Sequence, residues 1–158
     1  MVELTKEQAD FLLNCPKEVI SSNDLTFPNS QNKKLNIPLR STDGLYDFLL
    51  DINRNQISIY KATYQNRYNR SVVLARLDLN GAGHRNPDGH EVSGNHLHLY
   101  SQEYGDKVAI ELPECFNNIN PKNLPDMLLA FMEFCNIIKK PNFVYNLETG
   151  DIFNEYHN

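Results

Sequence analysis

Two short segments on either side of a histidine-rich loop constrain the fold more than any other feature of this chain. Residues 71–80, SVVLARLDLN, and residues 95–100, NHLHLY, alternate apolar and polar side chains, which is the pattern of a β-strand with one buried face. Because strand side chains repeat every two residues, Arg76 and Asp78 share one face of the first segment, and His96 and His98 share one face of the second. If the two strands pair, these four polar side chains converge on one face of a sheet.

The loop between the two segments adds further ionisable side chains to this face. Its sequence, GAGHRNPDGHEVSG, contributes His84, Arg85, Asp88 and His90, so that four of the five histidines of the chain fall within residues 84–98. The same loop holds Asn86-Pro87-Asp88-Gly89, which has the composition of a tight turn, so that Asp88 could serve only as the cap of that turn. Arg76 and Asp78 could likewise form no more than an ion pair. We predict a candidate active or binding surface here.

Helix signals lie on both sides of the strand-rich middle of the chain. Residues 5–8, TKEQ, form a capping box and predict a helix to about residue 14. Residues 123–140, NLPDMLLAFMEFCNIIKK, predict a second helix with an apolar stripe and a stop at Pro141. Further strands are expected at residues 34–41, 45–52 and 107–112, with a hairpin within 52–62.

The order of these elements predicts the fold class. It is that of an α+β domain: an antiparallel β-sheet of about five to six strands, with an N-terminal and a C-terminal helix packed on one face. A chain of 158 residues suits a single domain, which we place at residues 1–142, and residues 143–158 are expected to form a loosely ordered C-terminal tail.

Composition excludes several classes of protein. No apolar run approaches the roughly 18 residues of a membrane span, and the N-terminus lacks the apolar stretch of a signal peptide, so that we expect a cytoplasmic protein without membrane contact. Cys15, Cys115 and Cys135 are widely spaced and are expected to be buried free thiols in a reducing compartment. There is no phosphate-binding or dinucleotide motif, and no cofactor is expected.

The distribution of charge points to the middle of the chain. The net charge of −5 argues against indiscriminate nucleic-acid binding, yet residues 52–98 hold six bases against three acids. Bases interleaved with tyrosines suit phosphate contact combined with base stacking, as in single-stranded RNA binding. A solvated strand face with tyrosines at the sheet edges explains the pattern equally well. The candidate substrate-binding residues are Lys61, Arg67, Arg70, Tyr64, Tyr100, Lys107 and Asp88.

From about residue 4 to residue 142 the chain resembles an uncharacterised family of small bacterial and prophage-associated proteins, a domain of unknown function. The resemblance is carried by FLLDINR (48–54), TYQNR (63–67), VVLARLDLNG (72–81), HRNPDG (84–89), HLHLY (96–100) and YGDK (104–107). It implies no established activity. It implies that His84, Arg85, Asn86, Asp88, His96, His98, Tyr104 and Lys107 are characteristic of the family. His90 stands where the family is expected to have an acidic residue, and we leave it out of the candidate site.

Metal-independent cleavage of RNA is the function that these residues favour. Such a reaction needs a base for the 2′-OH proton, an acid for the leaving oxygen and cations for the charge on phosphorus. His96 and His98 are predicted to exchange protons, Arg76 and Arg85 to bind phosphate, and His84 to assist from the loop. The hypothesis is a toxin-type endoribonuclease whose partners are single-stranded RNA and a neutralising or target protein.

Two alternatives remain open at this stage. The first is a binding protein of a phage or other mobile element that inhibits a bacterial defence nuclease through acidic surfaces, such as Glu3, Glu7 and Asp10 or Glu148, Asp151 and Glu155. The second is a metal-binding enzyme, because a His-x-His pair on a strand projects both imidazoles to one side. In that case His84 or Asp88 would have to complete the coordination of the ion.

Overall fold

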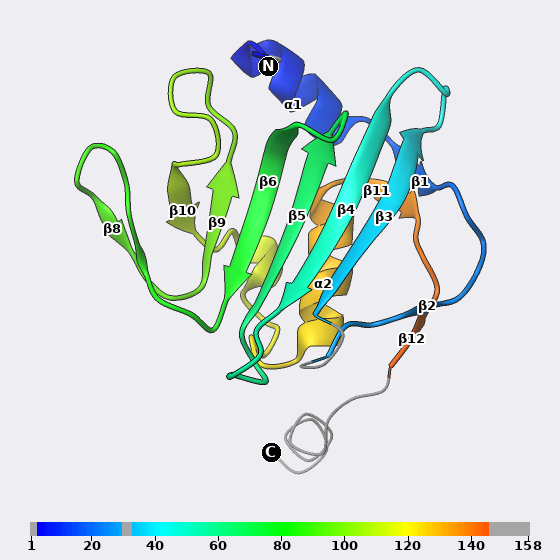
Figure 1. Cartoon of the computed structure of the whole chain (residues 1–158). Coiled ribbons are helices and arrows are strands. Elements are labelled where there is room, and N and C mark those ends of the chain that lie inside the picture. The colour runs from blue at the N-terminus through cyan, green and yellow to red at the C-terminus, as the bar shows by residue number, and fades with distance from the viewer. Residues whose placement is uncertain (1–2, 30–32, 146–158) are drawn as a thin grey trace.

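The fold is built on one large sheet, seen in a computed structural model that describes residues 3–29 and 33–145. Eight strands lie in the order β10-β9-β6-β5-β4-β3-β1-β11 (Figure 1). Their bounds in that order are Ala109–Glu111, His96–Leu99, Val72–Leu79, Ala62–Tyr68, Asp47–Arg54, Lys34–Ser41, Lys17–Val19 and Ile137–Lys139. All neighbours in this sheet are antiparallel except β1 and β11, which are parallel.

Short elements complete the described part of the chain. The helices are α1 (Lys6–Asn14) and α2 (Leu124–Phe134), with the single 3-10 turn η1 (Glu114–Phe116). Two small ladders lie outside the main sheet: β2 (Leu25–Thr26) pairs with β12 (Phe143–Val144), and β7 (His84–Arg85) pairs with β8 (Glu91–Val92). No helix within residues 3–29 and 33–145 is long and apolar enough to cross a membrane.

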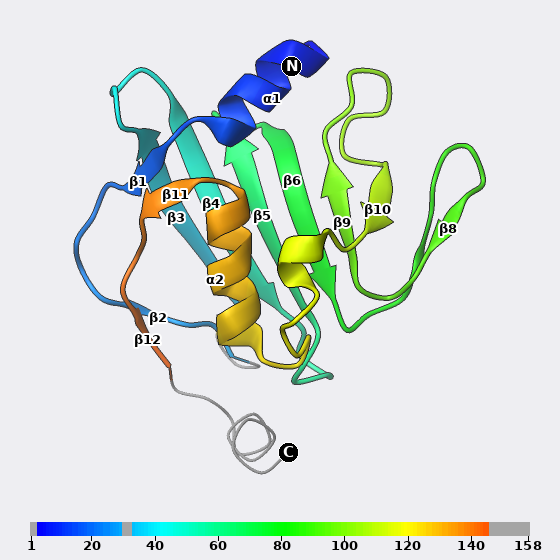
Figure 2. The same ribbon diagram turned by 180° about the vertical axis from the view of Figure 1, so that it is seen from behind.

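The predicted α+β class and the mostly antiparallel sheet are confirmed, whereas the strand number and the helix placement are wrong. The sheet has eight strands because β1 and β11, of three residues each, add to one edge and are too short to show an alternating pattern. Only α2 lies flat against a face of the sheet, as Figure 2 shows, and α1 lies across one end of the strands. Thr5 and Gln8 form the predicted capping box of α1.

The second helix is also shorter than its sequence predicts. It ends at Phe134, because Asn136 adopts a left-handed conformation with φ of 57° and turns the chain into β11. Ile138, which falls within the predicted helix of residues 123–140, lies instead on β11 with 57% of its surface exposed. The first two-thirds of the predicted helix therefore forms α2, and the remainder extends the sheet.

Two further expectations concern the C-terminal tail and the three cysteines. Residues 143–144 of the predicted tail form β12, and residues 146–158 lie outside the described residues. The three cysteines are free, and Cys15 and Cys135 are buried as expected, but Cys115 is exposed. It lies in η1 at the surface, and this three-residue turn is too short to show a periodicity by which its exposure could be predicted.

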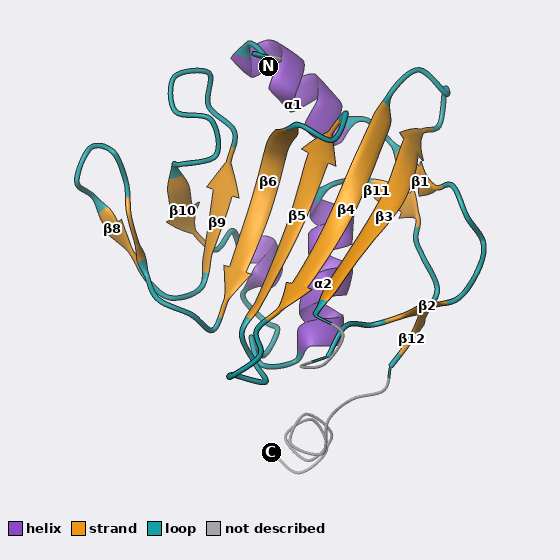
Figure 3. Cartoon of the chain, viewed as in Figure 1, coloured by secondary structure: helices purple, strands orange, loops and turns teal. Residues whose placement is uncertain are grey.

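The core lies between α2 and one face of the sheet. Leu77, Leu97 and Tyr64 are fully buried on this face, and the Tyr64 hydroxyl donates a hydrogen bond of 2.8 Å to the Leu124 carbonyl at the start of α2. The opposite face carries no described helix, as Figure 3 shows for the strands β3 to β6. Polar residues that alternate with the core residues on these strands therefore face an open side of the sheet.

A buried lysine joins α1, the first strand and the end of α2. Lys17 is 0% exposed, and its ammonium donates hydrogen bonds to the carbonyls of Leu13, Cys15 and Cys135 at 2.7, 3.0 and 2.7 Å. It also lies 4.7 Å from the centre of the Phe48 ring. Three carbonyls, two of them in buried hydrogen bonds, depend on this one cation, because buried polar groups without a partner are costly.

Replacing Lys17 with methionine is expected to lower the free energy of unfolding by about 2–4 kcal/mol, because the three carbonyls lose their donor while the side-chain volume is kept. Urea unfolding of the wild type and of Lys17→Met measures the difference. The matched control is Lys34→Met on the exposed side of β3, which should change the stability by less than about 0.5 kcal/mol. A loss below about 1 kcal/mol for Lys17→Met would contradict the role of this cation.

Candidate functional site

The pairing of β6 with β9 brings the predicted polar residues together. In this antiparallel ladder Arg76 lies opposite His98, and Asp78 lies opposite His96. All four side chains point away from α2, because Leu77 and Leu97, which oppose each other between them, point into the core. We call Arg76, Asp78, His96 and His98 the central cluster. The predicted convergence is therefore present in the structure.

Both histidines of the central cluster are oriented by backbone carbonyls. The Nδ1 atom of His96 lies 2.8 Å from the Ser93 carbonyl oxygen, and that of His98 lies 2.8 Å from the Asp106 carbonyl oxygen. A carbonyl oxygen only accepts, so Nδ1 is the donor in both rings. The two Nε2 atoms then point to the same oxygen, Oδ2 of Asp78, at 3.2 and 3.3 Å. His96 is 2% exposed and His98 is 1% exposed.

The Arg76 guanidinium closes the open side of this arrangement. Its Nε donates to Oδ1 of Asp78 at 3.1 Å, and one terminal nitrogen donates to Oδ2 of Asp106 at 3.1 Å. The other terminal nitrogen lies 3.0 Å from Nε2 of His98. With 27% of its side chain exposed, Arg76 is the cation of the cluster that a ligand from solvent would meet.

Asp78 is ionised in this environment. Its burial raises the pKa, but the hydrogen bond with His98 and the charge of Arg76 outweigh burial, and the pKa lies below its ordinary value. A carboxylate with two imidazole nitrogens on one oxygen and a guanidinium on the other can hold protons or a cation among these groups.

The HRNPDG loop folds back onto the cluster. His84 donates from Nε2 to the Lys107 carbonyl at 2.7 Å, and its ring lies 4.7 Å from the ring of His98 and 5.8 Å from that of His96. Asn86 holds the loop in place: its side-chain amide donates to the Ala109 carbonyl and its oxygen accepts from the Ala109 amide, both at 2.8 Å. Asn86 thus takes the place of a further strand along the free edge of β10.

Glycines allow the two arms of this loop to approach closely. A Cβ at Gly83 would lie 2.5 Å from the Val92 carbonyl oxygen, and a Cβ at Gly94 would lie 2.6 Å from that of Gly81. Asp88 accepts from the His90 amide at 2.9 Å, so it caps the turn, as one of the two sequence interpretations proposed. The exposed His90 lies at the tip, away from the cluster.

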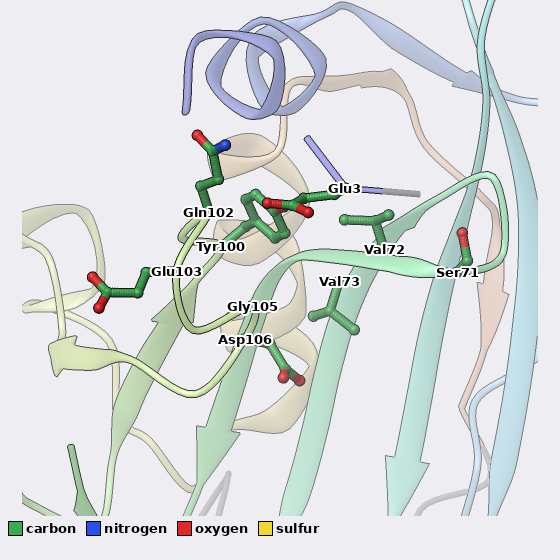
Figure 4. Close-up of a pocket in the computed structure, with 9 residues that line it drawn as sticks. All are labelled: Glu3, Ser71, Val72, Val73, Tyr100, Gln102, Glu103, Gly105 and Asp106. Atoms are coloured by element: carbon green, nitrogen blue, oxygen red, sulfur yellow. The ribbon is translucent and has the colours of Figure 1, made fainter. Parts of the chain in front are cut away.

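A cavity of about 480 Å³ lies beside the cluster and is lined in part by Asp106, the acceptor of a hydrogen bond from Arg76 (Figure 4). Glu3, Glu103 and Asp106 give its walls three carboxylates, and none of the side chains within residues 3–29 and 33–145 that line it is basic. Tyr100 also lines the cavity, and its hydroxyl exchanges two hydrogen bonds of 2.9 Å with the backbone of Leu4. An anionic ligand would therefore be repelled from this cavity and would meet Arg76 on the other side of Asp106.

Several predicted site residues lie outside the central cluster. Arg85 pairs with Glu91 on the exposed β7–β8 hairpin, and Lys61 and Arg70 are exposed in the turns that flank β5. Lys107 is exposed and contributes its backbone carbonyl to His84. Tyr64 lies in the core, where a ligand on the open face cannot reach it.

Arg67 remains on the open face but is held by a buried acid. It forms two hydrogen bonds with the Asp51 carboxylate, of which that from the terminal nitrogen is 3.0 Å long. Gln65, the neighbour of Arg76 across the β5–β6 ladder, donates to the same carboxylate at 2.8 Å. A polar row therefore runs from Asp51 through Gln65 and Arg76 to His98.

Sequence reasoning gave no structural role to three groups that shape the site, although the family resemblance names one of them, Asn86, as characteristic. Asp106 contributes both a carboxylate to Arg76 and a carbonyl to His98, the Ser93 carbonyl orients His96, and Asn86 anchors the loop. The backbone carbonyls have no sequence signature. Asp106 could have been suspected only from its place in the YGDK stretch that carries the family resemblance.

Replacing Asn86 with alanine is expected to lower the free energy of unfolding by about 1–3 kcal/mol, because two buried hydrogen bonds to Ala109 are lost. It should also release the hairpin that carries His84. Hydrogen exchange at the Ala109 amide is the direct measurement, and this amide should exchange at least about tenfold faster in the variant. The matched control is Arg85→Ala, which breaks an exposed ion pair and should change stability by at most about 0.5 kcal/mol. Unchanged exchange at Ala109 would show that Asn86 does not anchor the loop.

Comparison with known proteins identifies a family but no activity. A model described as "Family of unknown function (DUF6978)" matches residues 4–137. No curated protein matches the chain, and no solved structure matches it. The matched range contains the whole sheet up to the start of β11, including the central cluster and the HRNPDG loop. The chain belongs to the family of unknown function DUF6978.

Proposed function

We propose that this protein is an enzyme that cleaves RNA at the central cluster. The observation that supports the proposal is the convergence of a guanidinium, a carboxylate and two imidazoles on a sheet face that carries no described helix. Burying ionisable groups lowers stability unless they are paired, and such clusters concentrate at functional sites. A surface that served only for solubility would have no need of this arrangement.

The residue types favour a phosphodiester substrate that carries its own nucleophile. The cluster contains no cysteine. Ser93 contacts the cluster only through its backbone carbonyl, which accepts from His96, and its hydroxyl donates to Glu111 instead. RNA supplies a 2′-OH as the attacking group, so a site needs only proton exchange and charge stabilisation. Arg76 offers the second of these functions, and the imidazoles offer the first.

The positions of Arg76 and His98 suit a joint action on one phosphate. The guanidinium lies 3.0 Å from Nε2 of His98, so a phosphate bound by Arg76 on its solvent side would lie beside this imidazole. His98 can then accept the 2′-OH proton and return it to the 5′-oxygen as that oxygen leaves, while Asp78 stabilises the charged imidazole between the two transfers. His96, on the far side of Asp78, would hold that carboxylate in position. His84 lies against His98 and would limit the access of water.

The inhibitor alternative receives less support. It relies on acidic surfaces, but Asp10 is paired with Lys6 at 2.7 Å, and Glu3 lies in the wall of the cavity. Glu148, Asp151 and Glu155 lie outside the described residues. The pairing of Asp10 with Lys6 therefore weakens the acidic surface that this alternative requires.

Substitution of Arg76 tests the proposed function. Arg76→Gln is expected to lower the rate of RNA cleavage by at least about 100-fold, since it removes the charge that stabilises the phosphorus centre. The rate is measured on mixed single-stranded RNA with the purified full chain. The matched control is Arg70→Gln, an exposed arginine in the β5–β6 turn, which should keep the cleavage rate within about threefold of the wild type.

His98 provides the second variant. His98→Gln keeps a polar side chain of similar length and should reduce cleavage by about 100-fold or more, whereas His90→Gln at the hairpin tip should not. Circular dichroism and thermal unfolding confirm that each variant is folded. Absence of cleavage by the wild type, with and without divalent ions, would refute the proposal. Equal loss in the His98 and His90 variants would place the reaction elsewhere.

A further inference from the structure

We infer that the central cluster is a binding site for one divalent transition-metal ion, with Asp78, His96 and His98 as its protein ligands. The inference concerns the same centre as the proposed RNA cleavage but does not require RNA to be the substrate. A bound ion would take Nε2 of His98, the atom to which the proposed function gives proton exchange, so the two assignments are alternatives for this atom. It takes up one alternative that the sequence left open and changes one part of it, because neither Asp88 nor His84 supplies a ligand atom.

The argument begins with the direction of the imidazole lone pairs. Since Nδ1 of each ring donates to a carbonyl oxygen, the neutral rings carry their lone pairs on Nε2. Both Nε2 atoms face Oδ2 of Asp78 at 3.2 and 3.3 Å, and a carboxylate oxygen also only accepts. Three acceptor atoms thus converge on one point, and they repel one another unless a cation or protons lie among them.

The spacing of these atoms suits a metal ion. Metal–ligand distances near 2.0–2.1 Å in a tetrahedral site imply separations of about 3.3 Å between ligand atoms. The two separations from Asp78 Oδ2 agree with this value, and the three ligand atoms lie within 4.8 Å of one another. Two imidazoles and one carboxylate are a donor set that zinc, cobalt, manganese and iron accept.

The surroundings are those of a built metal site. Metal-bound histidines commonly donate their other ring nitrogen to a carbonyl or carboxylate, which fixes the tautomer and the ring orientation. The Ser93 and Asp106 carbonyls do this for His96 and His98. Both histidines are at most 2% exposed, and the ligands lie on two adjacent strands in fixed register. No other group of three or more potential metal ligands is found among residues 3–29 and 33–145.

Arg76 occupies the place where the ion would be most exposed. One terminal nitrogen lies 3.0 Å from His98 Nε2 and donates to Asp78 Oδ2 at 3.4 Å, so the guanidinium supplies the positive charge that the acceptors require. An ion would replace these two contacts, whereas the contacts of Arg76 with Oδ1 of Asp78 and with Asp106 use other atoms. Arg76 would then border an open coordination position, as in catalytic sites with three protein ligands.

Metal titration distinguishes a metal site from a purely structural ion-pair network, because only a metal site binds an added ion in competition with Arg76. The purified full chain is stripped with EDTA, dialysed, and titrated with Zn²⁺ by calorimetry and with Co²⁺ by visible absorption. One equivalent of Zn²⁺ should bind, and Co²⁺ should give d–d bands without the charge-transfer bands of thiolate ligands. At a hundredfold excess over Kd, Zn²⁺ should raise Tm by about 5–10 °C.

Four variants assign the ion to this site. Asp78→Asn and His98→Gln should each weaken Zn²⁺ binding by at least about 100-fold, and the control His90→Gln should bind as the wild type does. Arg76→Gln should bind Zn²⁺ more tightly, because a competing cation is removed. This last variant keeps all three ligands, so the inference stays testable even if a ligand variant does not fold.

The outcomes separate this inference from the proposed function. No binding of Zn²⁺ or Co²⁺ by the wild type, or binding that survives both ligand substitutions, would overturn the metal site. Cleavage of RNA in EDTA by a chain that binds no metal would also overturn it while supporting the proposed function. Metal binding that follows the expected order of variants, without RNA cleavage, would support the site and refute the RNA substrate.

Discussion

The candidate site depends on the register between β6 and β9. Leu77 and Leu97 oppose each other on the core face and are fully buried, and their burial fixes the register because a slip of one residue would turn them to the open face. The same register places Asp78 opposite His96 and Arg76 opposite His98. Hydrophobic packing on one side of the sheet therefore determines the polar geometry on the other side. The site can be precise without strong interactions of its own, since its backbone is held by the core.

Main-chain carbonyls then orient the imidazoles on this frame. Ser93, Asp106 and Lys107 each present a carbonyl oxygen to one of the three clustered histidines. These carbonyls belong to segments that follow β8 and β9, and the second of these segments is closed by the Ser101–Gly105 bridge. The backbone of the two loops that hold Ser93 and Asp106 thus decides which ring nitrogen of each histidine faces Asp78. An ion or a substrate would meet preoriented nitrogens rather than mobile side chains.

The two-residue alternation of strand side chains made the central cluster predictable. The same alternation did not predict correctly which residues of other strands face the core. Alternation tells which residues share a face, but not which face a helix covers. On β6 the covered face is uniformly apolar, so Arg76 and Asp78 could be assigned to the other side. On β5 the sequence ATYQNRY is polar or aromatic at most positions, and Tyr64 reads equally well as a stacking residue and as the core residue that it is. Asp106 escaped prediction because its contact with Arg76 spans 30 residues.

The sequence by itself determined the strands β3, β4, β6, β9 and β10, the capping box of α1, the start of α2 and the set of polar residues that share a face of β6 and β9. These features depend on neighbours within a few positions of the chain, and local periodicity records them. The tertiary structure alone decided that α1 lies at one end of the sheet, that the chain after Phe134 forms a strand, and that carbonyls from separate loops turn both Nε2 atoms toward Asp78. These features arise from contacts between distant segments, whose energies depend on packing and on backbone groups that every residue shares.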